Sequence, residues 1–326
     1  MKPLSRRTAL QSLAAYSLAP SLSALAQSAA WPSKPIRLIV PYPAGGSPDA
    51  VSRLVGEQMS KILATPVVVE NRPGGAALVG FRAMTAQPMD GHTLVYVSSG
   101  HVTLTATSPQ FDLLKESRLV TRMSSSPFLL VVNAESPHQT LQDLMKAVLA
   151  QPGKLSYGSA GPGSPAHMAV EYLAENLPGF NAIHVPFKGA VESANAILGK
   201  QIDFTIGVLG ALLPLVQAGK LRALGVTTSA RLKELPAIPT IAEAGAAGYQ
   251  FSAWGGLAMH KDTPEPIVQR MHQVVTEACA AESVRVLLQR SAALPDLSDS
   301  PRAFTATVER EIAAERRIVK RLGLSG

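Results

Sequence analysis

The sequence is poor in cysteine, in aromatic residues and in long apolar runs, and each shortage excludes a class of protein. Cys279 is the only cysteine in 326 residues, so no internal disulfide can form, and we expect this side chain to pack inside a helix. Aromatic residues make up 5% of the chain, and no basic run interleaves with them, which argues against a nucleic-acid-binding protein. After residue 26, no segment is long and apolar enough to span a bilayer.

The sequence also lacks the usual patterns of metal and cofactor sites. Its seven histidines are scattered, and no pair has the H-x-x-x-H spacing of helical zinc ligands. Residues 161–166 match a dinucleotide pattern in form, but two prolines remove N–H donors that a pyrophosphate would need. No acidic residue ends the following strand to hold a ribose. We therefore expect neither a metal nor a cofactor.

The N-terminus has the pattern of an export signal. Lys2, Arg6 and Arg7 precede a mildly apolar stretch, and Ala24-Leu25-Ala26 fits a cleavage site. The arginine pair resembles a twin-arginine signal, while the general secretory route and an uncleaved membrane anchor stay open as alternatives. Cleavage near Ala26 would lower the formal charge from +7 to +4, leaving a mildly basic exported protein suited to anionic ligands.

A strand, a glycine loop and a helix start follow one another near the mature N-terminus. Ile36 to Val40 is an apolar run, the loop 41–46 contains Gly45 and Gly46, and a helix is expected from Asp49 to Leu63. Ser47 and Asp49 are placed to cap that helix, and Pro48 suits its first turn. Free N–H groups at a helix start bind anions, and the loop carries no nucleophile. The segment therefore predicts capture of a carboxylate, although an ordinary capped helix start would look similar.

A second glycine loop, 158–165, follows another short strand and has two competing interpretations. As an anion loop it offers the hydroxyls of Ser159 and Ser164 and close backbone approach at Gly161 and Gly163. As a hydrolase elbow it would need a glycine at the position of Tyr157, and Ser159 has no identifiable base in the sequence. We favour the anion loop, with an exported serine hydrolase as the lesser alternative.

Strands and helices alternate through most of the chain and predict an α/β protein with helix-covered, mainly parallel sheets. Two α/β units follow one another, so the chain is expected to cross between domains near 132–135 and again near 251–257, with the C-terminal helices returning to the first domain. The predicted organisation is a signal peptide over 1–26, domain 1 over 27–132 plus 255–326, domain 2 over 133–254, and a ligand cleft between the domains.

Several landmarks together resemble one family, the Bug-type extracytoplasmic solute receptors of tripartite tricarboxylate transporters. Each landmark is weak alone, but they occur in order over nearly the whole mature chain. They are the segments 35–49, 69–74, 90–94, 158–167, 184–189, 218–224 and 239–245.

The resemblance implies a periplasmic binding protein of the Venus-flytrap fold that is not an enzyme. It implies a monomer that closes on a small organic carboxylate and delivers it to membrane permease subunits. Presentation of the ligand-bound form to a sensor kinase is the alternative. The candidate ligand-binding residues are Tyr42, Pro43, Ala44, Gly45, Gly46, Asp49, Ser98, Ser99, Ser159, Ala160, Gly161, Gly163, Ser164, His167, Phe187, Lys188, Gly189 and Asp203.

The candidate residues outside the two glycine loops could have roles other than ligand binding. His167, near a helix start, could equally be a packing or capping residue. Lys188 could face the cleft or be solvated, and Asp203 could orient a bound water or close a turn. The family often has tyrosine where this chain has Phe187, so one polar contact of the site could be missing. The segment 111–118 also departs from the family pattern.

Overall fold

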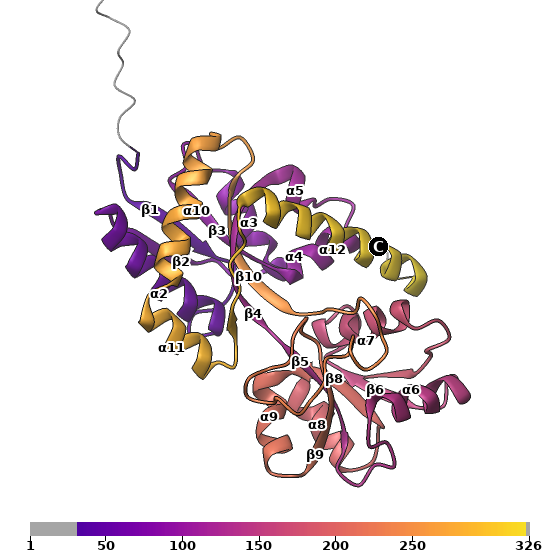
Figure 1. The fold of residues 1–326 in the computed structure, drawn as a ribbon. Helices are drawn as coiled ribbons and strands as arrows, with labels where there is room; N and C mark the ends of the chain where they lie inside the picture. Colours follow the sequence, from indigo (N-terminus) through magenta and orange to yellow (C-terminus); the bar gives the residue numbers. More distant parts are fainter. Residues whose placement is uncertain (1–30, 324–326) are drawn as a thin grey trace, which may run out of the picture. The chain divides into compact units, whose positions relative to one another are not determined.

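The computed structural model describes residues 31–323, and residues 34–326 form one compact unit (Figure 1). The expected signal peptide and its cleavage site lie outside the described residues. Two β-sheets with helices on their faces organise this unit, which confirms the predicted α/β class. Within the described part of the chain, no helix is both long and apolar enough to cross a bilayer.

The first sheet has six strands in the order β11–β4–β10–β3–β1–β2. Strand β1 pairs in parallel with β2 and β3, whereas β10 runs antiparallel to β3 and β4, and β11 runs antiparallel to β4. The strands are β1 (Ile36–Val40), β2 (Val67–Asn71), β3 (Thr93–Ser98), β4 (Ser117–Ser126), β10 (Ala253–His260) and β11 (Leu294–Pro295).

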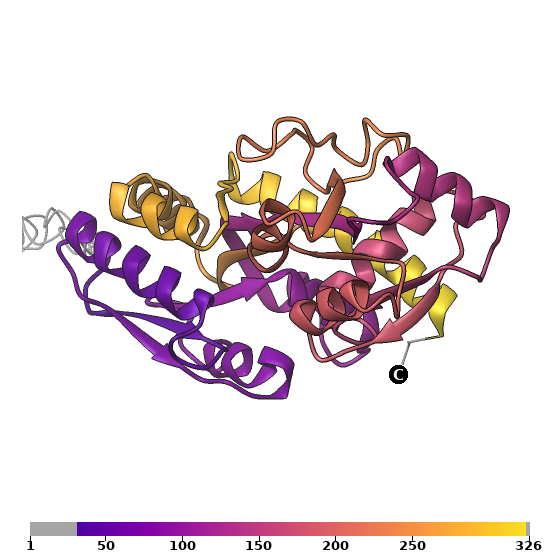
Figure 2. The same ribbon diagram turned by 90° about the horizontal axis from the view of Figure 1, so that it is seen from below.

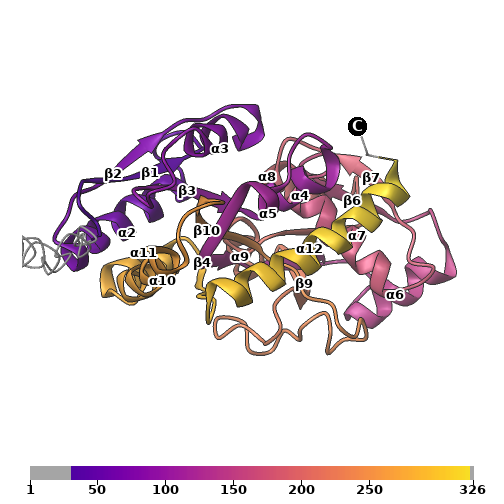
Figure 3. The same cartoon turned by 90° about the horizontal axis from the view of Figure 1, so that it is seen from above.

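Helices cover both faces of the six-stranded sheet. Helices α10 (Glu265–Cys279) and α11 (Glu282–Arg290) lie beside α2 (Ser47–Leu63) on one face (Figures 2 and 3). The other helices are η1 (Gly75–Ala77), α3 (Leu78–Thr85), α4 (Ser99–Thr107), α5 (Leu113–Glu116) and α12 (Pro301–Leu322). Phe81 of α3, Val102 of α4 and Phe304 of α12 share one buried cluster with β1 and β3. Cys279 is buried in α10, as expected.

The second sheet has five strands in the order β7–β6–β8–β5–β9, and β5 (Phe128–Asn133) shows why both of its faces are covered. Successive strand side chains point to opposite faces. Leu130 and Val132 pack with α6 and α7, whereas Leu129 and Val131 pack with α8 and α9. The remaining elements are β6 (Ser156–Ser159), β7 (Ile183–Pro186), β8 (Phe204–Val208), β9 (Leu221–Val226), α6 (Leu141–Ala150), α7 (Pro165–Asn176), α8 (Ala190–Leu198) and α9 (Leu209–Gln217).

The strand pairing refines the predicted sheets. The expected parallel arrangement holds for β1, β2 and β3 and for β6, β7 and β8, but antiparallel pairs complete both sheets, which are therefore mixed. The chain leaves the six-stranded sheet at Ser126 and joins the five-stranded sheet at Phe128, ahead of the segment 132–135 where the sequence places the crossing. The division into two domains with the stated boundaries stays a prediction.

Candidate functional site

The first candidate loop joins β1 to α2 and holds its shape through a side chain of the helix. Gly46 is the N-cap of α2 and Pro48 lies in the first turn, as expected, but no side chain caps the helix. The prediction that Ser47 and Asp49 are caps was therefore wrong. Asp49 Oδ2 instead accepts the N–H of Gly45 at 2.9 Å. Gly45 has a φ of +85°, which a residue with a side chain rarely adopts, so a glycine is needed at this turn.

Asp49 is buried, with 4% of its surface exposed, and is held from two further sides. Asn71 at the end of β2 donates to Asp49 Oδ1 at 2.9 Å, and Arg53 one turn along α2 forms an ion pair with the same oxygen at 2.9 Å. Burial alone would raise the pKa of Asp49, but the hydrogen bonds from Gly45, Arg53 and Asn71 outweigh it and lower the pKa. The carboxylate is thus a fixed, ionised support for the loop.

Asn71 is a supporting residue that the sequence analysis did not assign to the site. Its side-chain amide also donates to the carbonyl oxygen of Tyr42 at 3.1 Å, so it ties both ends of the loop to β2. The signal for it was present, since Asn71 lies inside the 69–74 landmark of the family resemblance. Its role depends on the parallel pairing of β1 with β2, which places Asn71 opposite Val40.

The fixed loop leaves backbone donors free at the start of α2. Ala50 donates its N–H to Gly46 at 3.0 Å, and Pro48 has no N–H to offer. The N–H groups of Gly46, Ser47 and Asp49 have no hydrogen-bond acceptor among residues 31–323. Residues 43–47 are also exposed. An exposed helix start with unsatisfied N–H groups can hold an anionic oxygen.

Tyr42 connects this loop to the end of β3. Its hydroxyl lies 2.8 Å from Oγ of Ser98, and burial raises the pKa of Tyr42, so it stays a neutral phenol. Ser98 in turn caps α4, because its Oγ accepts the N–H of Gly100 at 3.2 Å while its own N–H donates to Nδ1 of His101 at 3.2 Å. Ser99 is the first residue of α4. The structure therefore brings Tyr42, Ser98 and Ser99 to one edge of the sheet.

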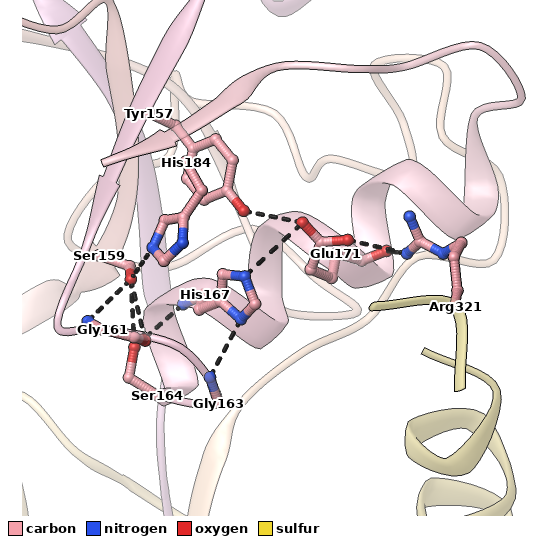
Figure 4. A network of polar contacts seen from close by, with 9 residues as sticks. All are labelled: Tyr157, Ser159, Gly161, Gly163, Ser164, His167, Glu171, His184 and Arg321. Atoms are coloured by element: carbon pink, nitrogen blue, oxygen red, sulfur yellow. Dashed lines mark hydrogen bonds and ion pairs between the residues drawn. The ribbon is translucent and has the colours of Figure 1, made fainter. Parts of the chain in front are cut away.

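The second candidate loop joins β6 to α7 and is closed by its own hydroxyl groups (Figure 4). Oγ of Ser159 accepts the N–H of Gly161 at 3.1 Å, and the hydroxyl of Ser164 points to the same oxygen at 3.4 Å. Ser164 caps α7 by accepting the N–H of His167 at 3.3 Å. His167 Nδ1 accepts the N–H of Gly163 at 3.1 Å. His167 is thus a capping residue, which is one of the two roles the sequence left open.

Behind this loop, aromatic rings and one carboxylate form a buried network. The Tyr157 ring stacks on the His184 ring with centroids 5.0 Å apart, and its hydroxyl donates to Oε1 of Glu171 at 2.7 Å. Arg321 of α12 forms an ion pair with Oε2 of Glu171 at 2.9 Å, so this contact joins α12 to α7 (Figure 4). Burial lowers the pKa of His167, and burial with the nearby His167 lowers that of His184 to about 4.

The structure supplies a base that the sequence analysis did not find for Ser159. Nε2 of His184 lies 2.6 Å from its Oγ. However, Ser159 is only 1% exposed, and its Oγ already lies within hydrogen-bond distance of the backbone of Gly161. Among residues 31–323, no carboxylate hydrogen-bonds to His184 to orient it as a catalytic histidine would require. The pair therefore has the geometry of a loop support.

Helix α4 lies near both candidate loops. A side-chain carbon built on Gly163 would lie 4.0 Å from Cγ2 of Thr103, one turn after Ser99. The tip of the second loop therefore passes close to the helix that begins beside Tyr42 and Ser98.

The remaining candidate ligand-binding residues lie in different parts of the structure. Phe187 donates its N–H to the carbonyl of Ser159 at 2.8 Å, so the turn 187–189 adjoins the second loop. The Lys188 side chain is exposed. Asp203 lies at the opposite end of β6, where its Oδ2 accepts the N–H of Ser156 at 2.7 Å, and it therefore joins the starts of β6 and β8. The other loop candidates, Pro43, Ala44 and Ala160, are exposed. As ligand contacts, all of these residues stay predictions.

Comparisons with known proteins identify the family. The profile of the tripartite tricarboxylate transporter family receptor, TctC, matches residues 51–324. A Cupriavidus necator protein from the region 5′ of gbd is 34% identical over 306 residues, which are 94% of this chain and 92% of that protein. Protein BugT of Bordetella pertussis is 30% identical over 283 residues, which are 85% of this chain and 86% of BugT.

Solved structures give the same assignment and confirm the periplasmic-binding-protein fold. A TctC solute-binding protein from Polaromonas, solved without ligand, superposes with a TM-score of 0.83 at 26% identity, covering 89% of this chain and 99% of that one. A Rhodopseudomonas palustris protein solved with adipate has a TM-score of 0.68 at 30% identity, covering 90% and 98%. MatC of R. palustris with bound malate has a TM-score of 0.65 at 28% identity, covering 89% and 100%. The chain belongs to the TctC family of tripartite tricarboxylate transporter receptors and is a solute-binding receptor, not an enzyme.

Proposed function

We propose that this receptor captures a small carboxylate-bearing ligand in the periplasm and delivers it to the permease subunits of a tripartite tricarboxylate-type transporter. The observation that carries the proposal is the β1–α2 loop, where Asp49 and Asn71 fix the backbone and leave the N–H groups of Gly46, Ser47 and Asp49 without acceptors. Two structural relatives, solved with adipate and with malate, support a carboxylate as the ligand class.

In this proposal, backbone N–H groups make most of the hydrogen bonds to the ligand. Hydrogen bonds from N–H groups to an ionised carboxylate are stronger than bonds between neutral groups, and the dipole of a helix start adds to them. The start of α2 supplies such donors, and closure of the two predicted domains around the ligand would exclude water from them. The signal sequence expected over 1–26, cleaved near Ala26, would deliver the protein to the periplasm, where it would act as a monomer.

Gly46→Val tests the assigned loop. Gly46 has a φ of −79°, and an added side chain would meet only Pro43 and Pro48 at 3.8 and 3.7 Å, so the variant should fold. Its branched side chain would cover the free N–H groups. Gly199→Val is the matched control, because Gly199 also has a φ of −79° and ends α8, away from both loops.

The experiment is a thermal-shift screen with carboxylates and their matched amides. A ligand present at about 100 times its Kd stabilises a protein by roughly 2.7 kcal/mol. We expect stabilisation by an acid but not by its amide, loss of that shift in Gly46→Val, and an unchanged shift in Gly199→Val. Equal binding in both variants would refute the loop assignment. Co-purification of the loaded receptor with a membrane kinase instead of a permease would favour the sensor alternative.

A further inference from the structure

A polar cavity lies along α12, and none of the residues that line it belongs to the network drawn in Figure 4. Its volume is about 470 Å³, which suits a small organic molecule. Figure 3 shows α12 passing from the helices of the six-stranded sheet toward α7, and the cavity lies between these elements. The residues that line it are Ser99, Arg122, Tyr172, Gly248, Gln250, Phe251, Ser252, Thr307, Arg310, Glu311, Ala314 and Glu315.

Two carboxylates, Glu311 and Glu315, line the cavity from one face of α12 because residues four apart are neighbours on a helix. Glu315 is only 4% exposed, and its Oε2 has no hydrogen-bond partner among residues 31–323. Thr103 of α4 is the side chain that lies beside its carboxyl group. An unsatisfied buried carboxyl oxygen is costly, so its retention at a cavity wall points to a partner that arrives from outside.

The other charged side chains around the cavity make contacts of their own, and only the Nε of Arg122 is also without a hydrogen-bond partner among residues 31–323. Glu311 accepts the indole N–H of Trp254 at 2.8 Å and lies 3.9 Å from Arg122. Arg122 is paired with Asp296. Arg310 is exposed and donates to the hydroxyl of Thr307 at 3.2 Å.

Two neutral side chains of the lining are satisfied within the protein, since the hydroxyl of Tyr172 donates to the carbonyl of Glu311 at 3.3 Å and that of Thr307 donates to the carbonyl of Ala303 at 3.1 Å. Glu315 is left as the acceptor that a ligand could satisfy. Burial, with the charge of Glu311 adding to it, raises the pKa of Glu315 to about 8. The carboxyl is therefore mostly protonated at neutral pH.

Of the candidate ligand-binding residues, Ser99 at the start of α4 lines this cavity. Ser99 follows Ser98, the partner of Tyr42. Thr103, one turn further along α4, lies beside the carboxyl group of Glu315. A ligand whose carboxylate is held near the start of α4 could thus reach toward Glu315.

We propose that Glu315 receives a protonated amino group of the ligand, so that this receptor recognises amino-carboxylates and not simple carboxylates. The inference rests on the proposed carboxylate-binding function and adds the second recognition element. An ammonium group supplies three donors and a positive charge, which match the unpartnered Oε2 of Glu315 and the neighbouring charge of Glu311.

Binding of the ammonium group should expel the Glu315 proton. The Glu315 carboxyl is mostly protonated in the free protein at pH 7 and becomes ionised beside a cation, so binding releases up to about one proton per ligand. The amino group itself keeps its proton, since its pKa lies near 10. Affinity should therefore rise as the pH rises from 6 to 8, by up to about tenfold per pH unit.

The test is calorimetry on the purified protein with matched pairs of ligands, glutamate against glutarate and 4-aminobutyrate against butyrate. Measurements in buffers of different ionisation enthalpy give the protons released. We expect the amino member of a pair to bind roughly tenfold more tightly or better, with proton release. Glu315→Gln, which copies the protonated carboxyl in size, should remove both the preference and the proton release.

The outcomes separate the two proposals. Binding of both members of a pair with equal affinity overturns the amine inference and leaves the carboxylate receptor intact. A preference that survives in Glu315→Gln overturns the role of Glu315. If none of the acids and amino acids binds, or if Gly46→Val binds them as the unaltered protein does, the carboxylate-binding function itself falls, and the amine inference falls with it.

Discussion

Oγ of Ser159 lies 2.6 Å from Nε2 of His184, although 25 residues separate them in the chain. The parallel pairing of β6 with β7 creates this contact, because Ser159 ends β6 and Tyr157, two residues earlier, pairs with His184. A serine–histidine pair often indicates a nucleophile, but this one is buried beneath a glycine loop whose backbone it holds.

Ser159→Ala should therefore change stability and leave no hydrolytic activity to lose. The variant removes the acceptor of the Gly161 N–H and the partner of His184 Nε2, so we expect the free energy of unfolding to fall by about 1–3 kcal/mol. Urea unfolding measures this change. An ester-hydrolysis assay of the unaltered protein is the control, and an activity that Ser159→Ala abolishes would contradict the receptor assignment.

Acid should destabilise the protein through two neutral histidines. His101 is fully buried, and this burial lowers its pKa from 6.5 to about 4. Burial, together with the nearby His167, also lowers the pKa of His184 to about 4. The unfolded chain binds protons at these residues below pH 6.5, while the folded chain does not until about pH 4. The contribution of these two histidines to stability should thus be constant above pH 6.5 and fall between pH 6.5 and 4, by about 3 kcal/mol for His101 alone.

The variant that checks this prediction is His101→Gln. Glutamine suits the third position of a helix whose cap is serine, so Ser98 can keep its capping partner without a titrating group. Chemical denaturation at several pH values should show about one proton less taken up on unfolding. An unchanged pH dependence in the variant would show that His101 does not titrate as stated.

Asp49→Ala should loosen the first loop. The substitution removes the acceptor for Gly45 and for Asn71, so we expect a loss of about 2 kcal/mol in stability and weaker carboxylate binding. Glu57→Ala is the control on the same helix, because Glu57 forms an exposed pair with Lys61 that should contribute little. Equal effects of the two substitutions on ligand affinity would mean that Asp49 does not organise the loop.

Tyr42 and Ser98 should be energetically coupled. Tyr42→Phe and Ser98→Ala each remove the 2.8 Å hydrogen bond between the first loop and the end of β3, and the double variant removes it only once. A double-mutant cycle in urea should give a coupling of about 1 kcal/mol. Additive effects of the two substitutions would show that the hydroxyl groups do not support each other in solution.

Arg321→Gln should weaken the attachment of α12 to α7. Glu171 is largely buried and its Oε2 pairs with Arg321, but Arg321 is 47% exposed at its side chain, so solvent reduces the effect to about 1 kcal/mol. Arg317→Gln is the matched control, since the pair of Arg317 with Glu175 is more exposed. Thermal unfolding of the two variants compares them, and a larger loss in Arg317→Gln would contradict the prediction.

Local patterns in the sequence located most elements that carry the site. The apolar run from Ile36 to Val40 predicted β1 with the bounds that the structure has. Both glycine loops were found because a strand that ends in glycine and precedes a helix start is a local pattern. The sequence analysis did not place β4, β10 or α4.

These elements were missed because their sequences carry weak local signals. Strand β4 ends in Ser124, Ser125 and Ser126, and β10 contains Gly255 and Gly256, so neither has a clean apolar alternation. A side-chain carbon at Gly255 would lie 1.9 Å from the Tyr96 hydroxyl. Glycine is therefore required there by a neighbour that is distant in sequence, and only the assembled sheet reveals it.

The sequence by itself located the two loops and their glycines and predicted an anionic ligand, since these depend on residues within one turn of each other. Only the tertiary structure decided which groups support them. Asn71 reaches Tyr42 and Asp49, and His184 reaches Ser159, because neighbouring strands bring their carboxyl ends to one edge of a sheet. Burial then set the charge of each group, which depends on the atoms packed around it and not on its neighbours in the chain.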